Sequence, residues 1–305
     1  MALSLRSGTA ETLSTAMGDF QSVSHRGQET GRPVMRPALS VLLPIYRPRH
    51  DYLLTAIKSI LRQTFTGFEL LLIEAPSDIS IVELLPKVQD TRLRYLRYPG
   101  KASLVDQLNF GLQEAQALLI ARMDGDDWSY PERLQRQYDY LQTHPEVTVL
   151  GTQISIMDAK DRPLGYRRYP TQPEDVTRAL KRCNALAHPS VMYRRDAILA
   201  AGGYCYRDYP ANEDYELWCR LTRHGHKLSN LNETLLRYRI HSGAMKLEKL
   251  KNILRGTRLV KRHYYGDTMN AGDWTRYCAE GALLNLPGWA ILKLFQRLQY
   301  RQEST

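Results

Sequence analysis

A short apolar run that ends at a group of carboxylates constrains this chain more than any other feature. Residues 117–123 have the sequence Ala-Leu-Leu-Ile-Ala-Arg-Met, and Asp124, Asp126 and Asp127 follow directly. Such a run predicts a buried strand that delivers acidic side chains to the end of a sheet, where open α/β folds bind their ligands. The chain is therefore expected to adopt an α/β fold with a site at this point.

The spacing of these acids suits a metal ion. Asp124 and Asp126 stand at i and i+2 with Gly125 between them, so a tight turn can bring both to one hard divalent cation, Mg²⁺ or Mn²⁺. An acidic turn that caps a helix is the alternative. An EF-hand is excluded because its sixth and twelfth positions need Gly and Glu, whereas Ser129 and Gln135 stand there.

Composition limits the class of protein. With 305 residues, 43% of them hydrophobic, the chain can form one large globular domain plus extensions. Its formal charge of +10 favours anionic partners: phosphates, nucleic acid or an acidic membrane surface. No apolar run is long enough to span a bilayer, and we expect no signal peptide. The four cysteines lack Cys-x-x-Cys spacing, which predicts neither a zinc site nor a disulfide framework and fits a reducing cytosol.

The order of apolar patterns predicts a doubly wound, mostly parallel sheet. Residues 1–36 are polar and lack apolar periodicity, so we expect a disordered leader there. After it, buried runs alternate with helical periods. Strands are expected at 38–44, 68–74, 93–98 and 117–123, and helices at 52–61 and 104–115.

The second half is less regular. Pro131 is expected to open a helix with Glu132 in its first turn. The helical pattern itself covers 133–143. Further helices are expected at 172–181 and 196–201, and strands at 147–156 and 187–193. In residues 212–218, Asn-Glu-Asp-Tyr-Glu-Leu-Trp, the apolar spacing places Glu213 and Asp214 at a helix start, where the dipole stabilises carboxylates. A charged first turn without further function is the alternative.

Nine short motifs, taken together, resemble a family 2 glycosyltransferase of the GT-A fold. The resemblance runs from about residue 40 to 241 and places a catalytic domain at 37–244. The motifs are Val41-Leu-Leu-Pro-Ile-Tyr46, Ser59-Ile-Leu-Arg-Gln-Thr-Phe65, Phe68-Glu-Leu-Leu-Leu-Ile73, Leu108-Asn-Phe-Gly111, Asp124-Gly-Asp-Asp127, Pro131-Glu-Arg-Leu134, His188-Pro-Ser-Val-Met192, Gly202-Gly-Tyr204 and Asn212-Glu-Asp-Tyr-Glu-Leu-Trp218.

The resemblance implies an inverting glycosyltransferase that moves a sugar from a nucleotide diphosphate sugar, expected to be a UDP-sugar, to a glycan or lipid-linked acceptor. This reaction is expected to be a step in cell-surface polysaccharide biosynthesis. It implies that Asp126 binds the metal, that Asp124 contacts ribose or metal, and that Asp127 supports both. The base pocket is expected to be lined by Pro44, Ile45 and Tyr46.

On the acceptor side, the resemblance implies that Asp214 is the general base for the incoming hydroxyl. Glu213 and Trp218 are expected to orient it, and His188 and Ser190 to border the acceptor.

Two further residues carry open alternatives. Lys101 either reaches the phosphates or is a solvated surface lysine. His241 either helps the metal or phosphates or has a structural role.

The chain departs from the family pattern after the second expected strand. Two adjacent aspartates are usual there, and the second reads the uracil edge, but this chain has Glu74 followed by Ala75. Either Glu74, with its longer reach, takes over that hydrogen bond, or the base is recognised differently.

Residues 245–305 are expected to form basic amphipathic helices, one from Met245 and another after Pro287. They either pack on the catalytic domain or form a peripheral contact with an anionic inner leaflet, which would place the protein in the cytoplasm at the membrane.

Three other functions fit the sequence less well than this enzyme does. The basic charge would also suit a nucleic-acid-binding module, but the chain lacks a recognisable reading motif, so no nucleic acid is expected as a partner. A glycosidase uses paired carboxylates without a pyrophosphate-binding loop. A catalytically degenerate family member would not be expected to keep the acids of both sites.

Overall fold

The computed structural model describes residues 36–101, 103–205, 209, 211–240, 247–287 and 290. Contacts divide the chain into Met1–Met35 and Arg36–Thr305, and the fold is that of the second unit. The leader expected at residues 1–36 lies outside the described residues, apart from Arg36.

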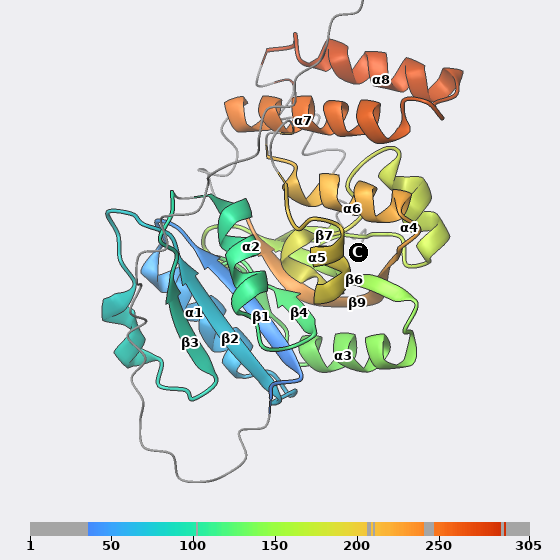
Figure 1. Cartoon of the computed structure of the whole chain (residues 1–305). Helices are drawn as coiled ribbons and strands as arrows, with labels where there is room; N and C mark the ends of the chain where they lie inside the picture. Colours follow the sequence, from blue (N-terminus) through green and yellow to red (C-terminus); the bar gives the residue numbers. More distant parts are fainter. Residues whose placement is uncertain are drawn as a thin grey trace, which may run out of the picture. The chain divides into compact units, whose positions relative to one another are not determined.

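The first half is the predicted alternation of strands and helices (Figure 1). Its elements are β1 (Leu39–Ile45), α1 (His50–Leu61), β2 (Phe68–Glu74), β3 (Leu93–Arg97), α2 (Leu104–Glu114) and β4 (Leu119–Arg122). The apolar runs of β1, β2 and β4 are buried nearly throughout, as expected of central strands covered on both faces. The half-buried β3 stands at the sheet edge, which confirms the expectation from its alternating pattern.

The second half adds short strands and helices to the same sheet. Its elements are β5 (Trp128–Ser129), α3 (Arg133–Thr143), β6 (Val147–Met157), β7 (Pro163–Arg167), α4 (Pro173–Leu180), β8 (Met192–Arg194), α5 (Arg195–Ala200), α6 (Glu213–Arg223) and β9 (Lys227–Arg239). The sequence did not predict β5, β7 and β9, nor the 3₁₀ helix η1 (Val82–Lys87) between β2 and β3.

Two predicted boundaries were wrong. The strand expected at 187–193 begins with a 3₁₀ turn, His188–Ser190, because Pro189 has no N–H for a ladder and the Ser190 N–H bonds back to Ala187. Pro131 does not open a helix, because the Pro131 carbonyl accepts from the Thr64 N–H; α3 instead spans Arg133–Thr143, the range of the expected helical pattern.

The strand order places a topological switch beside the predicted site. Within the described residues the order is β3-β2-β1-β4-β8-β6-β9-β5, with β7 paired to β6. The strands β1 to β4 are parallel, whereas β8 is antiparallel to β4. The chain leaves β1 toward β2 and β3 and returns on the other side of β1 as β4. Ligands of open α/β sheets bind at the carboxyl ends of strands at such a reversal, which here are the ends of β1 and β4.

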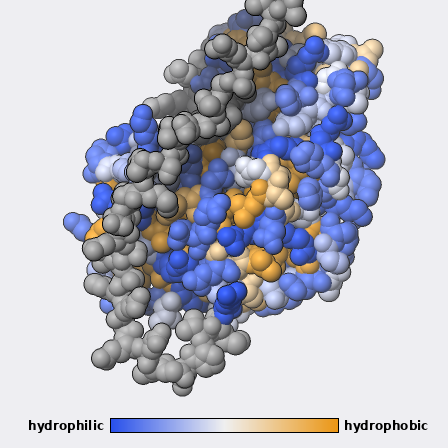
Figure 2. Space-filling view, viewed as in Figure 1, coloured by the Kyte–Doolittle hydropathy of each residue, from blue (hydrophilic) through white to orange (hydrophobic). Residues whose placement is uncertain are grey.

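Two apolar clusters sandwich the sheet, and the alternation along β1 shows why. Leu39, Val41 and Leu43 belong to one cluster with α1 and α3, whereas Leu42 belongs to the other with α2 and α6. Apolar colour gathers in the middle of the visible face and hydrophilic residues surround it (Figure 2). Burial of both sheet faces fixes the register of β1 and β4, and with it the direction in which their ends present polar groups.

The C-terminal region begins with the expected helix. Helix α7 (Leu247–Tyr265) is followed by α8 (Ala271–Leu283), which the sequence did not predict. Val260 and Tyr265 of α7 belong to the same apolar cluster as Trp218 of α6, so α7 packs on the sheet-bearing part of the chain. The helix expected after Pro287 lies outside the described residues apart from Ala290.

Candidate active site

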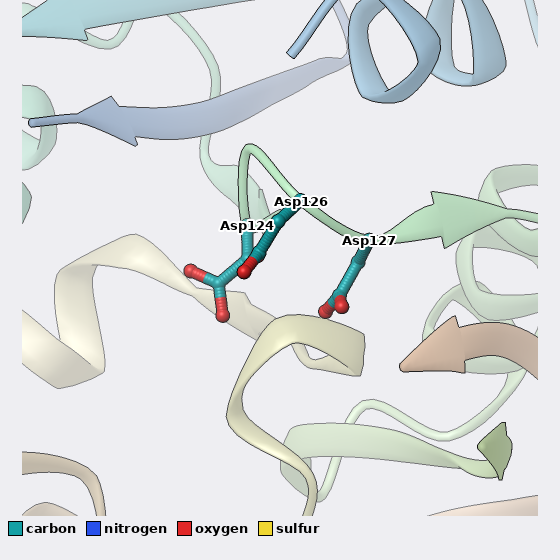
Figure 3. A group of neighbouring side chains, drawn as sticks. All are labelled: Asp124, Asp126 and Asp127. Carbon is teal, nitrogen blue, oxygen red and sulfur yellow. The ribbon is translucent and has the colours of Figure 1, made fainter. Parts of the chain in front are cut away.

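The predicted acidic loop lies at the carboxyl end of β4. One carboxylate oxygen from each of Asp124, Asp126 and Asp127 lies within 4.8 Å of the others. The three side chains point to the same side of the loop (Figure 3). A side chain at Gly125 would approach Leu53 of α1 at 3.2 Å, so the small residue lets the turn lie close to the helix. The local geometry matches a turn that gathers three oxygen ligands.

Asp127 is the buried member of this group. It is 1% exposed, and one carboxylate oxygen accepts a 2.8 Å hydrogen bond from the Arg239 N–H of β9. The other oxygen has no hydrogen-bond partner among the described residues. Burial, reinforced by the charges of Asp126 and Asp124, raises the pKa of Asp127. A buried carboxylate oxygen without a donor, beside two further carboxylates, fits a cation.

Arg122, the last residue of β4, supplies a positive charge to the loop. Its guanidinium Nη1 lies 2.6 Å from Asp124 Oδ2, and the side chain is 3% exposed. Asp124 itself remains partly exposed at 29%. One carboxylate of the loop is therefore paired with a buried cation while still open to a ligand.

The second predicted acidic group begins α6. Asp214 Oδ2 accepts a 2.7 Å hydrogen bond from the Asn184 side-chain amide, and Oδ1 accepts from the Tyr215 N–H. Burial raises the pKa of Asp214, although these donors oppose the effect. The carboxylate is thus held in one orientation, and it binds a proton more readily than an exposed aspartate does.

Glu213 connects the two acidic groups electrostatically. Burial first, and then the charge of Asp214, raises the pKa of Glu213 to about 7. The charge of Asp124 contributes to this rise, and that of Arg122 opposes it. The 3₁₀ turn that carries His188 packs against β4, and His188 lies beside Glu213, so the acids at the end of β4 and at the start of α6 face a common region.

The residues expected on the acceptor side lie next to Glu213. His188 Nδ1 is 4.0 Å from Glu213 Oε1, and its Nε2 is 3.1 Å from the Tyr204 hydroxyl. Burial lowers the pKa of His188, so the ring is neutral and its contact with Glu213 is not an ion pair. Trp218, fully buried, stands edge-on to His188 at 6.1 Å between ring centroids.

Ser190 is also on this side, but its hydroxyl is used within the fold. It donates to the Ala187 carbonyl and accepts from the Thr152 N–H. The residue is fully buried, so its contribution is to fix the loop that carries His188.

The expected base pocket follows β1. Ile45 is buried, and its carbonyl accepts from the Ala75 N–H and from the Gln107 side chain. Pro44 is half-buried, and Tyr46 is 50% exposed just beyond the strand end. An exposed aromatic ring at the carboxyl end of β1 is available to a planar ligand.

Glu74 does not offer its carboxylate to this pocket. It is 5% exposed, with one oxygen accepting from the Ile81 N–H and the other from the Tyr95 hydroxyl. The geometry therefore favours the second alternative from the sequence, that the base is recognised differently. Lys101 is exposed in the loop before α2, and His241 lies outside the described residues.

Sequence reasoning missed several residues that organise the site. Arg122 interrupts the apolar run before Asp124, and an arginine in such a run was a visible signal of a buried ion pair. Arg239 also stands in a strand, where it donates its N–H to Asp127 and its Nε–H to the Asp126 carbonyl. Nothing in the local sequence marks Asn184, which reaches Asp214 from thirty residues away.

Comparison with known proteins gives a consistent family. The family model described as glycosyl transferase family 2 matches residues 40–199. The O-antigen biosynthesis glycosyltransferase WbnJ of Escherichia coli is 33% identical over 210 residues, 67% of this chain and 80% of the relative. The amylovoran biosynthesis glycosyltransferase AmsE of Erwinia amylovora is 32% identical over 214 residues, 67% of this chain and 76% of that protein.

A solved structure shows the same arrangement of elements. The crystal structure of S. aureus TarS 1-349 superimposes with a TM-score of 0.56 at 14% identity, covering 79% of this chain and 78% of that one. A structure of the same fragment in complex with UDP-GlcNAc matches with a TM-score of 0.56 over 85% of this chain and 87% of that one, also at 14% identity.

Proposed function

The chain belongs to glycosyl transferase family 2 and has the GT-A fold, and from this premise we propose that it transfers a sugar, with inversion, from a UDP-sugar to a glycan or lipid-linked acceptor. The observation that carries the proposal is the group of three carboxylates at the end of β4, beside the strand reversal. Relatives named for O-antigen and amylovoran biosynthesis support a role in cell-surface polysaccharide formation.

The donor is proposed from two sources. The related S. aureus TarS has been crystallised with UDP-GlcNAc and with UDP, and a relative 26% identical is named as a UDP-Gal galactosyltransferase. In this chain the exposed ring of Tyr46 would stack against the base beside Pro44 and Ile45. Lys101, exposed on the same edge of the fold, is the proposed phosphate contact.

The residues at the end of β4 fit a divalent metal. Hard cations such as Mn²⁺ and Mg²⁺ prefer carboxylate oxygens, and Asp124, Asp126 and Asp127 supply three that converge. The buried Asp127 oxygen without a donor also favours a cation there. When bound, such an ion would neutralise charge on the diphosphate leaving group. His241 is a further proposed ligand.

Asp214 is the proposed general base. Its pKa is raised by burial, so it accepts a proton more readily than an exposed aspartate would. Asn184 and the Tyr215 N–H fix the carboxylate, and the remaining lone pairs are free to accept from an acceptor hydroxyl. Glu213, which borders His188 on the acceptor side, is proposed to orient Asp214, and buried Trp218 to pack α6 beneath it.

A screen of nucleotide sugars tests this function. Purified protein is incubated with each UDP-sugar and Mn²⁺, and release of UDP is measured with and without EDTA. We expect slow hydrolysis of one donor. This hydrolysis should require the metal and should be abolished in Asp126→Asn. Asp139→Asn, an exposed aspartate on α3, is the matched control and should retain the signal. Metal-independent hydrolysis, or an undiminished signal in Asp126→Asn, would contradict the proposal.

Peripheral contact with an anionic cytoplasmic leaflet is the proposed location. None of the described helices is long and apolar enough to cross a membrane. On α7 the apolar side packs on α6, while Arg255 and Arg262 are exposed. Exposed basic side chains of this kind attract acidic lipid headgroups.

The membrane contact is tested with sedimentation on anionic and neutral vesicles. Because Val260 and Tyr265 belong to the core, cutting off α7 would unfold the protein, so surface charge is changed instead. Arg255→Gln with Arg262→Gln should reduce binding to anionic vesicles, whereas Arg136→Gln with Arg162→Gln, two exposed arginines elsewhere, should not. Equal binding by all variants would remove the membrane role of α7.

A further inference from the structure

Arg122 is a charged residue inside the site that the proposed reaction does not use. Its backbone is fixed at the end of β4, where the N–H donates to the Val191 carbonyl. The side chain is 3% exposed. A guanidinium stays protonated at any ordinary pH, so the fold encloses a permanent positive charge here.

The guanidinium of Arg122 contacts one acid of the loop. Nη1 lies 2.6 Å from Asp124 Oδ2, and Asp124 in turn has an oxygen within 4.8 Å of oxygens of Asp126 and Asp127. Neither Nε nor Nη1 of Arg122 has a hydrogen-bond partner among the described residues, so the contact with Asp124 is a close ion pair rather than an aligned hydrogen bond. The charge is therefore directed at the acidic loop without being fully satisfied by it.

Arg122 also lies near the start of α6, because its N–H bonds to Val191, directly after the 3₁₀ turn that places His188 beside Glu213. It lowers the pKa of Glu213 and of Asp214, against the larger effect of burial, and that of Asp127 in the loop. The carboxylates of the loop, with oxygens within 4.8 Å of one another, repel each other, and the repulsion grows where water is excluded. A single enclosed cation that acts on both groups reduces this repulsion.

A second arginine provides a contrast. Arg133 is fully buried too, but its guanidinium donates to the Arg122 carbonyl, to the Gln137 side chain and to the sulfur of Met123. These hydrogen-bond partners are neutral groups. If only the burial of an arginine mattered, removing Asp124 would change the stability in the same direction whether Arg122 or Arg133 was absent.

We propose that Arg122 is a positioning residue that serves as the internal counter-ion of the active site, holding Asp124 and offsetting the repulsion among the acids of the loop and of α6. Its charge takes part of the place of a divalent cation. Removing it makes the fold more dependent on such a cation. The role of Arg122 as counter-ion needs no bound metal, whereas the dependence on a cation rests on the metal site of the proposed function.

The first test measures the melting temperature of the full chain in EDTA. Arg122→Gln should lower it by about 10 °C, since the acids of the loop then lose their buried counter-charge. Asp124→Asn should lower it in the wild-type background, where Arg122 loses its partner, but raise it in Arg122→Gln, where it relieves repulsion. In Arg133→Gln, Asp124→Asn should lower it as in wild type.

Reversal of sign in the Arg122→Gln background alone supports the counter-ion, and a decrease in every background overturns it. Arg122→Lys guards against a variant that fails to fold, because lysine keeps the charge but changes the shape. It should lose less than half of what Arg122→Gln loses. If both substitutions destabilise alike, the shape of arginine is what matters and the proposal is wrong.

The second test adds Mn²⁺ alone. The melting temperature should rise further in Arg122→Gln than in wild type, with Mn²⁺ bound on the order of tenfold more tightly because a competing cation is gone. Equal gains in the two proteins would overturn the link between Arg122 and the cation. If Mn²⁺ stabilises neither protein while the sign reversal in EDTA holds, Arg122 keeps its role and the metal site of the proposed function fails.

Discussion

The two acidic groups of the site are built in different ways. Asp124, Asp126 and Asp127 lie in one turn after a central strand, so four consecutive residues and the register of β4 fix their geometry. Asp214 depends on residues brought from elsewhere: Asn184 holds its carboxylate, and α7 packs against its helix. The first group is local and tied to the sheet, whereas the second is assembled by contacts between distant segments.

This difference divides the proposed reaction. The end of β4 would hold the donor, and α6 would serve the acceptor. A change at one should leave the binding step of the other intact if the division is right.

Substitution of the acids should separate binding from transfer. Asp126→Asn should abolish Mn²⁺-dependent binding of UDP, measured by calorimetry, because a metal ligand is lost. Asp214→Asn should bind UDP within about threefold of wild type yet lose transfer by about 10²–10⁴-fold, the usual contribution of a general base. Comparable loss of UDP binding in both variants would mean that the two acidic groups do not have separate tasks.

The sequence predicted the local group better than the assembled one, for a physical reason. An apolar run followed by Asp124 contains both the strand and the ligands, so reading along the chain is sufficient. It also placed Asp214 at a helix start, because that depends on nearby apolar spacing. It could not show that Glu74 is buried against Tyr95 and Ile81, since the pairing partner of a carboxylate is set by the sheet order.

The unpredicted strands have the same explanation. β5 has only the residues Trp128–Ser129, too few for a period, and exists because it pairs with Leu236 and Arg237 of β9. This pairing closes the acidic loop from its far side and brings Arg239 N–H to Asp127. A contact across more than a hundred positions leaves no trace in either segment alone.

The activity that depends on the start of α6 should change when a contact from α7 is removed. The Asn212 side chain donates to the Ile253 carbonyl and accepts from the Thr257 hydroxyl, directly before Glu213 and Asp214. Thr257→Val removes the hydroxyl at nearly constant volume, and we expect kcat to fall by about three- to tenfold, the value of about 1 kcal/mol for a hydrogen bond that orients a reacting group. KM for the donor should stay unchanged.

Two variants make this test specific to α7. Thr257→Ser keeps the hydroxyl and should restore kcat. Thr275→Val on α8, where the hydroxyl bonds to the Ala271 carbonyl within the same helix, should have no effect. Loss of donor affinity in Thr257→Val, with kcat intact, would break the proposed separation between the two halves.

The smallest expected effect is a pH dependence of stability from Glu213. Its pKa in the fold is raised to about 7 by burial and by the charges of Asp214 and Asp124, above the ordinary value of 4.5. Between these values the folded chain binds more protons than the unfolded chain, so this contribution to stability is complete below about 4.5 and is lost as pH rises through about 7.

Glu213→Gln cannot titrate, and in EDTA its melting temperature should fall less than that of wild type between pH 5 and about 8. Glu132→Gln, an exposed glutamate before α3, is the matched control and should follow wild type. Because Asp124 contributes to the raised pKa, Asp124→Asn should also flatten the wild-type slope, although less than Glu213→Gln does. A slope that Asp124→Asn leaves unchanged would mean that the acids of the loop and of α6 act independently, despite facing one region.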